Sequence, residues 1–250
     1  MKTCIVTGAS RGIGRAISVA LSQQEDIQNF IILARTEEGL VETKGLMAAG
    51  KNIEHYHIDL TNYEEVQTLV QAIGQKYGTI DLLINVAGYA DPKSLLETTI
   101  ENWETTYRIN VHSIFNITKE VVKFMKRTGG KILNVASTSG ITPRPGWLAY
   151  ASSKAAIISM SQTLSEELSD YGILVYCISP GRCATELRKI LAPDEDPTTI
   201  MQPEEVGDVV RHLLSDSGVC LDGQNIIVRK QVKKQTASVK VEVAPAGVVK

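Results

Sequence analysis

Tyr150 and Lys154 stand four residues apart at the start of an apolar, helix-forming run, just after a proline-rich turn. Residues at positions i and i+4 share one face of a helix, so the phenol and the ammonium group point the same way. Tyrosine has an unperturbed pKa of about 10, and a cation held nearby favours the phenolate and lowers that pKa. The pair therefore indicates a tyrosine suited to general acid–base catalysis. An exposed helical pair without any catalytic role has the same spacing, so other residues must decide.

A glycine-rich turn follows the first apolar segment of the chain. Residues 7–14 read Thr-Gly-Ala-Ser-Arg-Gly-Ile-Gly, between a predicted strand and a predicted helix. Glycines let the backbone come close to a phosphate, while the N–H groups and the dipole of the helix favour an anion. The turn predicts a dinucleotide site. Its expected members are Gly8, Ser10, Arg11, Gly12, Ile13 and Gly14.

The end of the second predicted strand bears on the choice of cofactor. An NAD site usually has an acidic residue here, which binds the ribose hydroxyls. This chain has Ala34 and Arg35 instead. Arg35 and Arg11 could bind a 2′-phosphate, because a guanidinium group matches the geometry of phosphate. Two solvated surface arginines are the alternative, and we expect NADP(H) to be favoured over NAD(H).

Small and polar residues also follow the third and fourth predicted strands. Asp59 and Leu60 come after the third, where the carboxylate could accept a hydrogen bond from adenine or could cap the next helix. Asn85, Ala87 and Gly88 end or follow the fourth, and their size allows close approach of a ring or a ribose. We expect all five residues to contact the cofactor.

Two further polar residues are candidates for the chemistry. Ser137 follows the fifth predicted strand, thirteen residues before Tyr150. Asn110 lies inside a long predicted helix that begins near Glu101. A polar residue within a helix is tolerated at the surface, but the Asn110 side chain could also hold a water molecule.

Short apolar segments alternate with runs of helical period along the chain. One such run has the capping-box pattern Thr61-x-x-Glu64 at its start. Continuous apolar strands between helices predict a parallel sheet covered on both faces, and right-handed crossovers make it a doubly wound, Rossmann-type α/β fold. Ligands of such folds bind beyond the carboxyl ends of the strands. The predicted strands are Thr3–Thr7, Asn29–Ala34, Ile53–Ile58, Ile80–Asn85, Lys131–Ala136, Ile173–Ser179 and Asn225–Arg229.

Domain boundaries follow from the same alternation. We expect one domain over residues 1–229, followed by a poorly anchored basic tail at 230–250. Residues 229–250 hold six basic side chains against one acidic side chain. Within the tail, residues 238–243 alternate polar and apolar as an edge strand would, so the tail could also join the sheet or a neighbouring subunit.

Composition excludes several other classes of protein. The formal net charge of −2 predicts no strong attraction to nucleic acid or to anionic membranes. The four cysteines are far apart and without histidines at ligand spacing, which argues against a metal site and against a disulfide framework. No apolar run approaches the roughly 18 residues of a membrane span, and no signal peptide precedes the first strand. We expect a cytoplasmic protein.

Over nearly all of residues 3–228 the chain resembles the short-chain dehydrogenases/reductases. Residues 7–14 match the family's T-G-x-x-x-G-x-G, and residues 85–88 resemble its N-N-A-G with one substitution. Pro180-Gly181 followed by Thr185 resembles its motif on the nicotinamide side of the cofactor. The resemblance places the catalytic tetrad at Asn110, Ser137, Tyr150 and Lys154.

The resemblance implies a hydride transfer between a nicotinamide and a ketone, an aldehyde or a secondary alcohol. Tyr150 would be the general acid/base, Ser137 would hydrogen-bond the same substrate oxygen, and Lys154 would bind the nicotinamide ribose and depress the Tyr150 pKa. Asn110 would hold a water that links Lys154 to bulk solvent. Tyr150, Lys154, Pro180, Gly181 and Thr185 join the cofactor site, and Ser137, Tyr150, Trp147 and Leu187 are expected at the substrate.

The nearest subgroups by resemblance are the 3-oxoacyl-acyl-carrier-protein reductases and the small NADP-dependent carbonyl reductases. The former often have an arginine before the glycine that leads into the sixth strand, whereas Asp170 and Tyr171 stand here. Lys123, Lys126 and Arg127 keep some basic surface nearby. A non-catalytic NADP-binding regulator is a further alternative, although the complete tetrad argues against it.

The resemblance also implies a homodimer or homotetramer. A dimer through the helices that hold Asn110 and Tyr150 is expected. One tetramer interface is in doubt, because the Gly-Gly pair that often follows Asp near the C-terminus is replaced here by Gly223 and Gln224. The pocket itself, bordered by a lid over residues 186–202 and by Tyr89, Ile141, Trp147 and Leu148, is expected to be mostly apolar.

Overall fold

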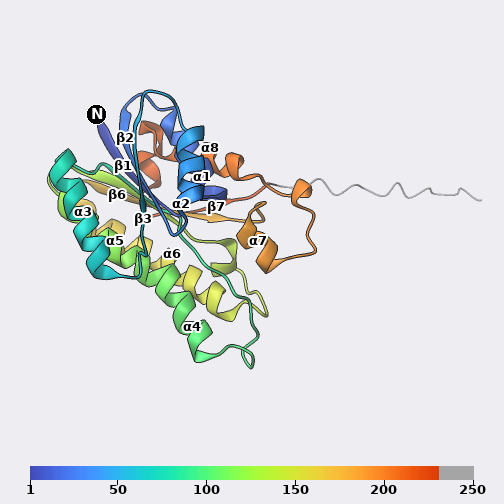
Figure 1. The fold of residues 1–250 in the computed structure, drawn as a ribbon. Coiled ribbons are helices and arrows are strands. Elements are labelled where there is room, and N and C mark those ends of the chain that lie inside the picture. Colours follow the sequence, from blue (N-terminus) through green and yellow to red (C-terminus); the bar gives the residue numbers. More distant parts are fainter. Residues whose placement is uncertain (231–250) are drawn as a thin grey trace, which may run out of the picture.

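The structure is a computed structural model, and it describes residues 1–230 of the chain. Its centre is a seven-stranded sheet in which every pairing is parallel, in the order β3-β2-β1-β4-β5-β6-β7 (Figure 1). The doubly wound fold is thereby confirmed, and all seven predicted strands are present with ends moved by no more than two residues. The strands are β1 (Lys2–Thr7), β2 (Ile27–Ala34), β3 (Asn52–His57), β4 (Leu82–Asn85), β5 (Gly130–Val135), β6 (Ile173–Pro180) and β7 (Asn225–Val228).

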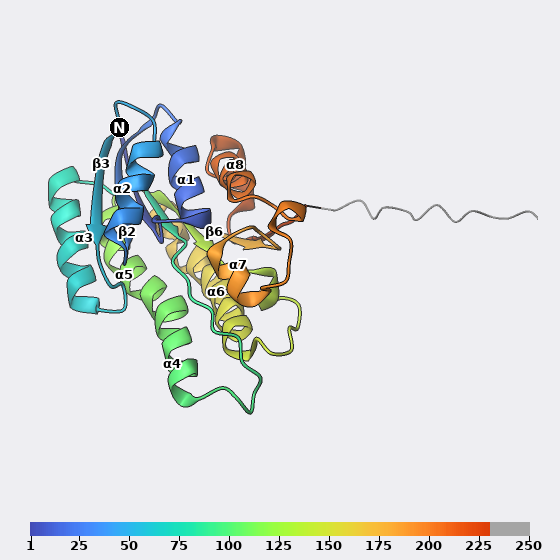
Figure 2. The ribbon, with the colours of Figure 1, turned by 45° about the vertical axis from the view of Figure 1, so that its right-hand side comes forward.

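Helices cover both faces of this sheet (Figures 1 and 2). On one face lie α1 (Gly12–Ser22), α2 (Glu37–Leu46) and α8 (Pro203–Leu213), and on the other α3 (Tyr63–Tyr77), α5 (Ser113–Met125) and α6 (Leu148–Leu168). Two shorter helices, α4 (Ile100–Tyr107) and α7 (Glu186–Leu191), lie beyond the carboxyl ends of the strands.

Side-chain alternation along β1 shows why two cores form. Cys4 and Val6 pack with Ile17 of α1 in one hydrophobic cluster, while Ile5 packs with Val121 of α5 in the other. Successive residues of a strand point to opposite faces, so a continuous apolar strand supplies both cores. The chain winds outward from β1 to β3 on one side and from β4 to β7 on the other. This switch point between β1 and β4 leaves a crevice at the carboxyl ends of the strands.

The long helix expected from about Glu101 is present from Ile100 to Met125, but it contains a π-helical turn. A π-helical turn at Arg108–His112 separates α4 from α5, and the Ser113 amide donates to the Arg108 carbonyl across it. A π-turn inserts an extra residue into the helical ladder and therefore changes the direction in which its side chains point. Asn110 is at the centre of this turn.

The cap of α3 is also displaced from its predicted place, by one residue. Asn62 is the N-cap: its Oδ1 accepts from the Glu65 amide, and its Nδ2 donates to the Glu65 carboxylate. Thr61 lies in the turn that precedes the helix, where its amide donates to Asp59 Oδ1 at 2.9 Å. Asp59 therefore does not cap α3, which was one of the two roles expected for it.

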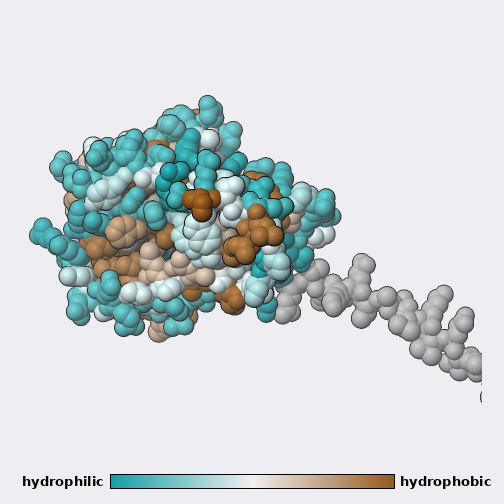
Figure 3. Space-filling model, turned by 90° about the horizontal axis from the view of Figure 1, so that it is seen from below, coloured by the Kyte–Doolittle hydropathy of each residue, from teal (hydrophilic) through white to brown (hydrophobic). Residues whose placement is uncertain are grey.

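Large apolar side chains remain exposed near α4 and α5. Leu95, Leu96 and Ile100 are 72 %, 96 % and 75 % exposed, and Phe115 of α5 is 54 % exposed. Figure 3 views the molecule from below and shows apolar side chains gathered in patches on this side.

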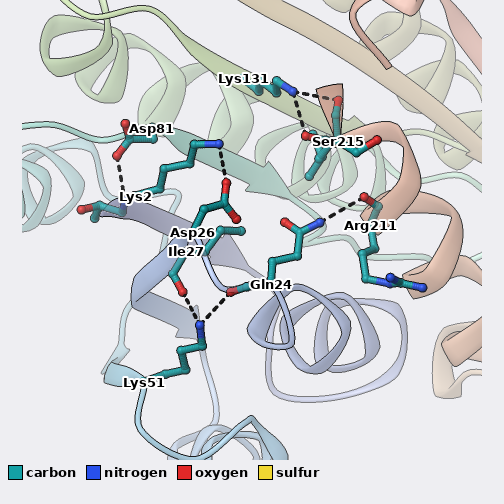
Figure 4. Close-up of polar contacts among 11 residues, drawn as sticks. Lys2, Gln24, Asp26, Ile27, Lys51, Asp81, Lys131, Arg211 and Ser215 are labelled. Atoms are coloured by element: carbon teal, nitrogen blue, oxygen red, sulfur yellow. Dashed lines mark hydrogen bonds and ion pairs between the residues drawn. The ribbon is translucent and has the colours of Figure 1, made fainter. Parts of the chain in front are cut away.

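The amino ends of the strands are tied together by polar contacts (Figure 4). Lys51 Nζ donates to the carbonyls of Gln24 and Ile27, and Lys131 Nζ donates to those of Leu214 and Ser215. The carbonyls of Gln24, Leu214 and Ser215 lie just beyond the ends of α1 and α8, and the Ile27 carbonyl belongs to β2. These bonds stabilise the edge of the sheet that lies opposite the crevice.

Within residues 1–230 no helix is long and apolar enough to cross a membrane. The expected tail, with the alternating segment at 238–243, lies outside the described residues except for its first member, Lys230, whose ammonium pairs with Glu205 at 2.9 Å.

Candidate active site

A cavity of about 520 Å³ opens at the carboxyl ends of the strands, where the crevice was expected. It gathers residues from both halves of the sheet and from the lid. The predicted site residues that line it are Gly8, Ser10, Arg11, Gly12, Ile13, Gly14, Arg35, Asp59, Leu60, Ala87, Gly88, Ser137, Trp147, Tyr150, Lys154, Pro180, Gly181, Thr185 and Leu187.

The glycine turn has no room for side chains. A Cβ atom on Gly8 would lie 2.7 Å from the Ala87 amide nitrogen, and one on Gly14 would overlap the Gly8 carbonyl. Gly8 also has a φ of +65°, in the left-handed region that favours glycine. Thr7 Oγ1 accepts hydrogen bonds from the amides of Val86 and Ala87, which joins the end of β1 to the end of β4. The bare backbone and the start of α1 therefore form a cradle of the kind that holds a diphosphate.

Arg11 and Arg35 both line the cavity and are exposed. Neither forms an ion pair with any residue in the described range 1–230. Glu37, two residues after Arg35, pairs with His55 at 2.8 Å and with neither arginine. Both guanidinium groups can therefore accept an anionic partner.

Asn85 is the one predicted cofactor residue that the structure does not bring to the cavity. Its side chain is 1 % exposed and lies between β4 and β5, where Nδ2 donates to Asn134 Oδ1 at 2.9 Å and to Thr118 Oγ1 at 3.3 Å. The alternation of side chains along β4 turns Asn85 into the layer beneath the sheet. Its contribution is to join neighbouring elements.

Asn110 does not line the cavity either, and its amide is engaged by protein groups. Oδ1 accepts from the Tyr89 amide at 2.7 Å, and Nδ2 donates to the Tyr89 carbonyl at 3.0 Å and to Ser153 Oγ at 2.9 Å. The side chain is fully buried. Both donor protons and one acceptor site thus position the loop after β4 against α6. The expected water contact of this side chain stays a prediction.

Tyr150, Ser137 and Lys154 converge on the cavity from two elements. Tyr150 and Lys154 come from α6, and Ser137 follows β5. Ser137 Oγ accepts from the Ser139 amide at 3.2 Å and from Ser139 Oγ at 2.9 Å, which leaves its own proton free to donate. Lys154 Nζ donates to the Val135 carbonyl at 3.0 Å and lies 5.8 Å from the centre of the Tyr150 ring.

The Tyr150 pKa shifts in the direction opposite to the expected one. Burial raises the pKa of Tyr150 to about 12, against smaller lowering effects of the Ser137 hydroxyl and the Arg188 charge. Burial lowers the pKa of Lys154 to about 8. Removing either group from water disfavours its charged form, and at this separation the ammonium does not reverse that cost. Tyr150 is therefore neutral near pH 7 and carries a proton that it can donate.

Sequence reasoning missed Arg188. It belongs to α7 in the lid, its Cζ lies 5.8 Å from the centre of the Trp147 ring, and its Nε donates to Glu195 Oε2 at 2.5 Å. Arg144 and Arg182 line the cavity as well. The expectation of a mostly apolar pocket is thus incomplete. The lid sequence does contain the arginine, but only the fold of the lid shows that it faces Trp147.

Of the four residues expected on the other walls of the pocket, only two line the cavity. Tyr89 and Trp147 line the cavity, Ile141 lines a neighbouring pocket, and Leu148 lines neither.

The family model for short chain dehydrogenases matches residues 2–196. The chain belongs to the short-chain dehydrogenase/reductase family. It is accordingly an oxidoreductase acting on carbonyl and alcohol groups.

Its curated relatives include a 3-oxoacyl-acyl-carrier-protein reductase of Thermotoga maritima, 33 % identical over 236 residues that cover 90 % of this chain and 95 % of the relative. A 2,3-dihydro-2,3-dihydroxybenzoate dehydrogenase of Bacillus subtilis is 29 % identical and covers 89 % of this chain and 95 % of its own length. Among solved structures, an actinorhodin polyketide ketoreductase determined with NADPH has a TM-score of 0.82 at 28 % identity, covering 91 % of this chain and 95 % of that one.

Proposed function

We propose that this short-chain dehydrogenase/reductase is an NADP(H)-dependent reductase of ketones or aldehydes, with Tyr150 as the general acid. The observation that carries the proposal is the convergence of Tyr150, Ser137 and Lys154 on a cavity whose other end is a glycine cradle. In the oxidative direction the same residues would act on a secondary alcohol, with Tyr150 as the base.

The protein groups suit the reduction of a carbonyl. Tyr150 is neutral near pH 7, so it can donate its proton to the carbonyl oxygen as negative charge develops there. Ser137 has a proton free to hydrogen-bond the same oxygen, which stabilises that charge. Lys154, which titrates near pH 8, can supply a nearby positive charge and bind hydroxyl groups.

The cavity fits NADP(H) by several of its own features. The glycine turn would hold the diphosphate, and Arg11 and Arg35 would bind the 2′-phosphate. The remaining contacts would come from Asp59, Leu60, Ala87, Gly88 and the Pro180-Gly181…Thr185 segment, all of which line the cavity. When bound, the nicotinamide supplies or accepts the hydride. The ketoreductase determined with NADPH supports this choice of cofactor.

A more specific candidate is reduction of 3-oxoacyl groups on an acyl carrier protein. Several curated relatives, the Thermotoga maritima protein among them, carry that activity in their names. On the surface, Gly130 N donates to the Gly172 carbonyl, so the exposed Lys126 and Arg127 lie near Asp170 and Tyr171. Basic side chains beside this turn could meet an acidic carrier protein, but the two residues before Gly172 are not basic.

We also propose a homodimer. Exposed apolar side chains near α4 and α5 include Leu96 and Phe115. A second copy could cover the apolar patches on this side of the molecule (Figure 3). This is the side of the molecule that carries the helices holding Asn110 and Tyr150. Size-exclusion chromatography with light scattering tests this assembly directly.

The central experiment is to follow NADPH oxidation at 340 nm against a panel of aldehydes, ketones and 3-oxoacyl thioesters. The thioesters should be offered both on an acyl carrier protein and on N-acetylcysteamine, so that recognition of the protein is separated from recognition of the acyl group. Turnover of any carbonyl with NADPH supports the proposal. Tight NADPH binding with no oxidation across the panel would instead indicate a non-catalytic cofactor-binding protein.

A further inference from the structure

A second pocket, of about 290 Å³, adjoins the catalytic cavity. The two share the lining residues Thr138, Arg144, Gly181 and Arg182. One extended molecule could therefore contact both. We call this second pocket the basic annex, since its lining includes four cationic side chains and, among the residues described, no carboxylate. These are Arg144, Arg182, Arg229 and Lys230.

Protein acids compensate only part of this charge. Arg182 Nη1 pairs with Glu195 at 3.2 Å, and Lys230 pairs with Glu205 at 2.9 Å. Arg144 and Arg229 make no side-chain hydrogen bond or ion pair with any residue in the range 1–230. Arg144 and Arg229 are thus two cations in a concave site that no acidic side chain of the described residues neutralises. Clustered like charges repel one another, and an anion placed among them is favoured.

Arg188 extends the positive charge toward Tyr150. Its Nε is bonded to Glu195, but neither of its Nη atoms has a partner within the described part of the chain. The side chain is only 20 % exposed and lies against Trp147. Glu195 also pairs with Arg182, so one carboxylate neutralises the charge of two guanidinium groups only in part. Guanidinium N–H groups that lack partners in a half-buried site are suited to bind a carboxylate or a phosphate.

We propose that the substrate is an anionic carbonyl compound, whose carboxylate or phosphate binds in the basic annex while its carbonyl lies at Tyr150. This inference rests on the proposed reductase function and specifies the substrate class. The annex meets the cavity at Thr138, the residue after Ser137, whereas Arg11 belongs to the glycine cradle and Arg35 follows β2. Two groups of arginines would then bind two different anions.

Matched pairs of ketones test this assignment. Acetoacetate is compared with methyl acetoacetate, and dihydroxyacetone phosphate with dihydroxyacetone, at constant ionic strength with NADPH. The charged member of at least one pair is expected to have the higher kcat/KM, and the pair that shows it identifies the anion as carboxylate or phosphate. Arg229→Ala, which lies outside the catalytic cavity, should lower kcat/KM for that charged ketone about tenfold or more, as expected for loss of a charged hydrogen bond. Turnover of the neutral partner should be unchanged.

A binding measurement makes the annex testable apart from turnover. With NADP⁺ at saturation to occupy the cofactor's own phosphate sites, calorimetric titration with inorganic phosphate and with acetoacetate should show binding by the wild type. Arg229→Glu should abolish it. The control variant is Arg127→Ala, because Arg127 is exposed beside the amino end of β5, at the opposite edge of the sheet. It should bind as the wild type does.

Two results would overturn the proposal. One is turnover of neutral ketones with no preference for their charged partners and no effect of Arg229→Ala, which would leave the reductase function intact. The other is an absence of anion binding to the NADP⁺ complex. If no ketone is reduced at all, the reductase function fails, and the titration still decides whether the annex binds anions.

Discussion

Asn110 Nδ2 donates a hydrogen bond of 2.9 Å to Ser153 Oγ, and Ser153 Oγ donates in turn to the Tyr150 carbonyl at 2.7 Å. The π-helical turn is thereby linked to the helix that carries the proposed acid. Asn110 also binds the amide and the carbonyl of Tyr89, so one buried side chain orders three segments around the cavity. This makes Asn110 a positioning residue.

Asn110→Ala should lower both stability and turnover. The substitution leaves the Tyr89 amide and carbonyl without their partner, and a buried polar group left unsatisfied costs about 1–3 kcal/mol. Urea denaturation should show a loss of about 2 kcal/mol or more. Ser153→Ala is the matched variant: it removes one of the three Asn110 contacts and the Ser153 bond to the Tyr150 carbonyl, keeps both contacts to Tyr89, and should lose less. Equal losses in the two variants would contradict the positioning role.

Tyr150→Phe should reduce kcat by about 10²- to 10⁴-fold, the usual contribution of a general acid or base. Phenylalanine retains the ring that packs edge-on to Trp147, with centres 6.3 Å apart, and removes only the hydroxyl. NADPH binding, measured by fluorescence titration, should therefore persist. A variant that keeps nearly full activity would show that another group supplies the proton.

Lys154 should make the free energy of unfolding depend on pH. Its pKa falls from 10.5 to about 8 on folding, because the ammonium is buried. Between pH 8 and 10.5 this lysine binds more protons in the unfolded chain than in the native one, so its contribution to stability rises with pH in this window, by up to about 1.4 kcal/mol per unit. Below pH 8 the full cost of the buried charge is present.

The Lys154 contribution is measured by urea denaturation between pH 8 and 9.5 as the difference between the wild type and Lys154→Met. The comparison is needed because burial also raises the thiol pKa of Cys4, Cys177 and Cys183, and these groups lower stability as pH rises in this range. Above pH 10 the raised pKa of Tyr150 acts in the opposite sense, because the unfolded phenol loses its proton first. The stability of the wild type relative to that of Lys154→Met should therefore rise with pH across the same range. Parallel curves for the two proteins would mean that Lys154 titrates at its ordinary value.

Arg35→Ala should weaken NADPH binding about tenfold or more and leave NADH binding nearly unchanged. The reason is that only NADPH carries the 2′-phosphate, and a hydrogen bond to a charged group contributes about 1.5–3 kcal/mol. Dissociation constants for both cofactors with the same protein supply the internal control. Equal weakening of both would refute the assignment of Arg35 to the phosphate.

Replacing two helical glycines by alanine should change the stability of the protein in opposite directions. In Gly14→Ala the new Cβ would overlap the Gly8 carbonyl, so the glycine turn must shift, and we expect a loss of about 2 kcal/mol or more together with weaker cofactor binding. Gly45→Ala in α2 meets nothing within 4 Å and should be stabilising by about 0.5–1 kcal/mol, because alanine favours the helix. Thermal or urea unfolding of the two variants compares them directly.

The sequence by itself determined the order of strands and helices, and with it most of the cavity lining. Continuous apolar segments such as Ile173–Ser179 are long enough to be strands and too short to be core helices, so local pattern identified them. Parallel strands end at the same edge of the sheet, so residues after strand ends, such as Gly8 and Ser137, were expected to meet there. Neither inference needs knowledge of a neighbour's position.

Only the tertiary structure decided the features that depend on burial or on distant partners. The π-turn places Asn110 against Tyr89 and Ser153, and no local pattern encodes that contact. Asn85 ends β4, a position where cofactor-binding residues are expected, but its side chain is buried between β4 and β5 and does not reach the cavity. The pKa of Tyr150 rises because the folded chain excludes water from its hydroxyl, an effect larger than the attraction of a lysine one turn away. The basic annex likewise exists because the lid, the proline-rich turn and the end of β7 meet in space.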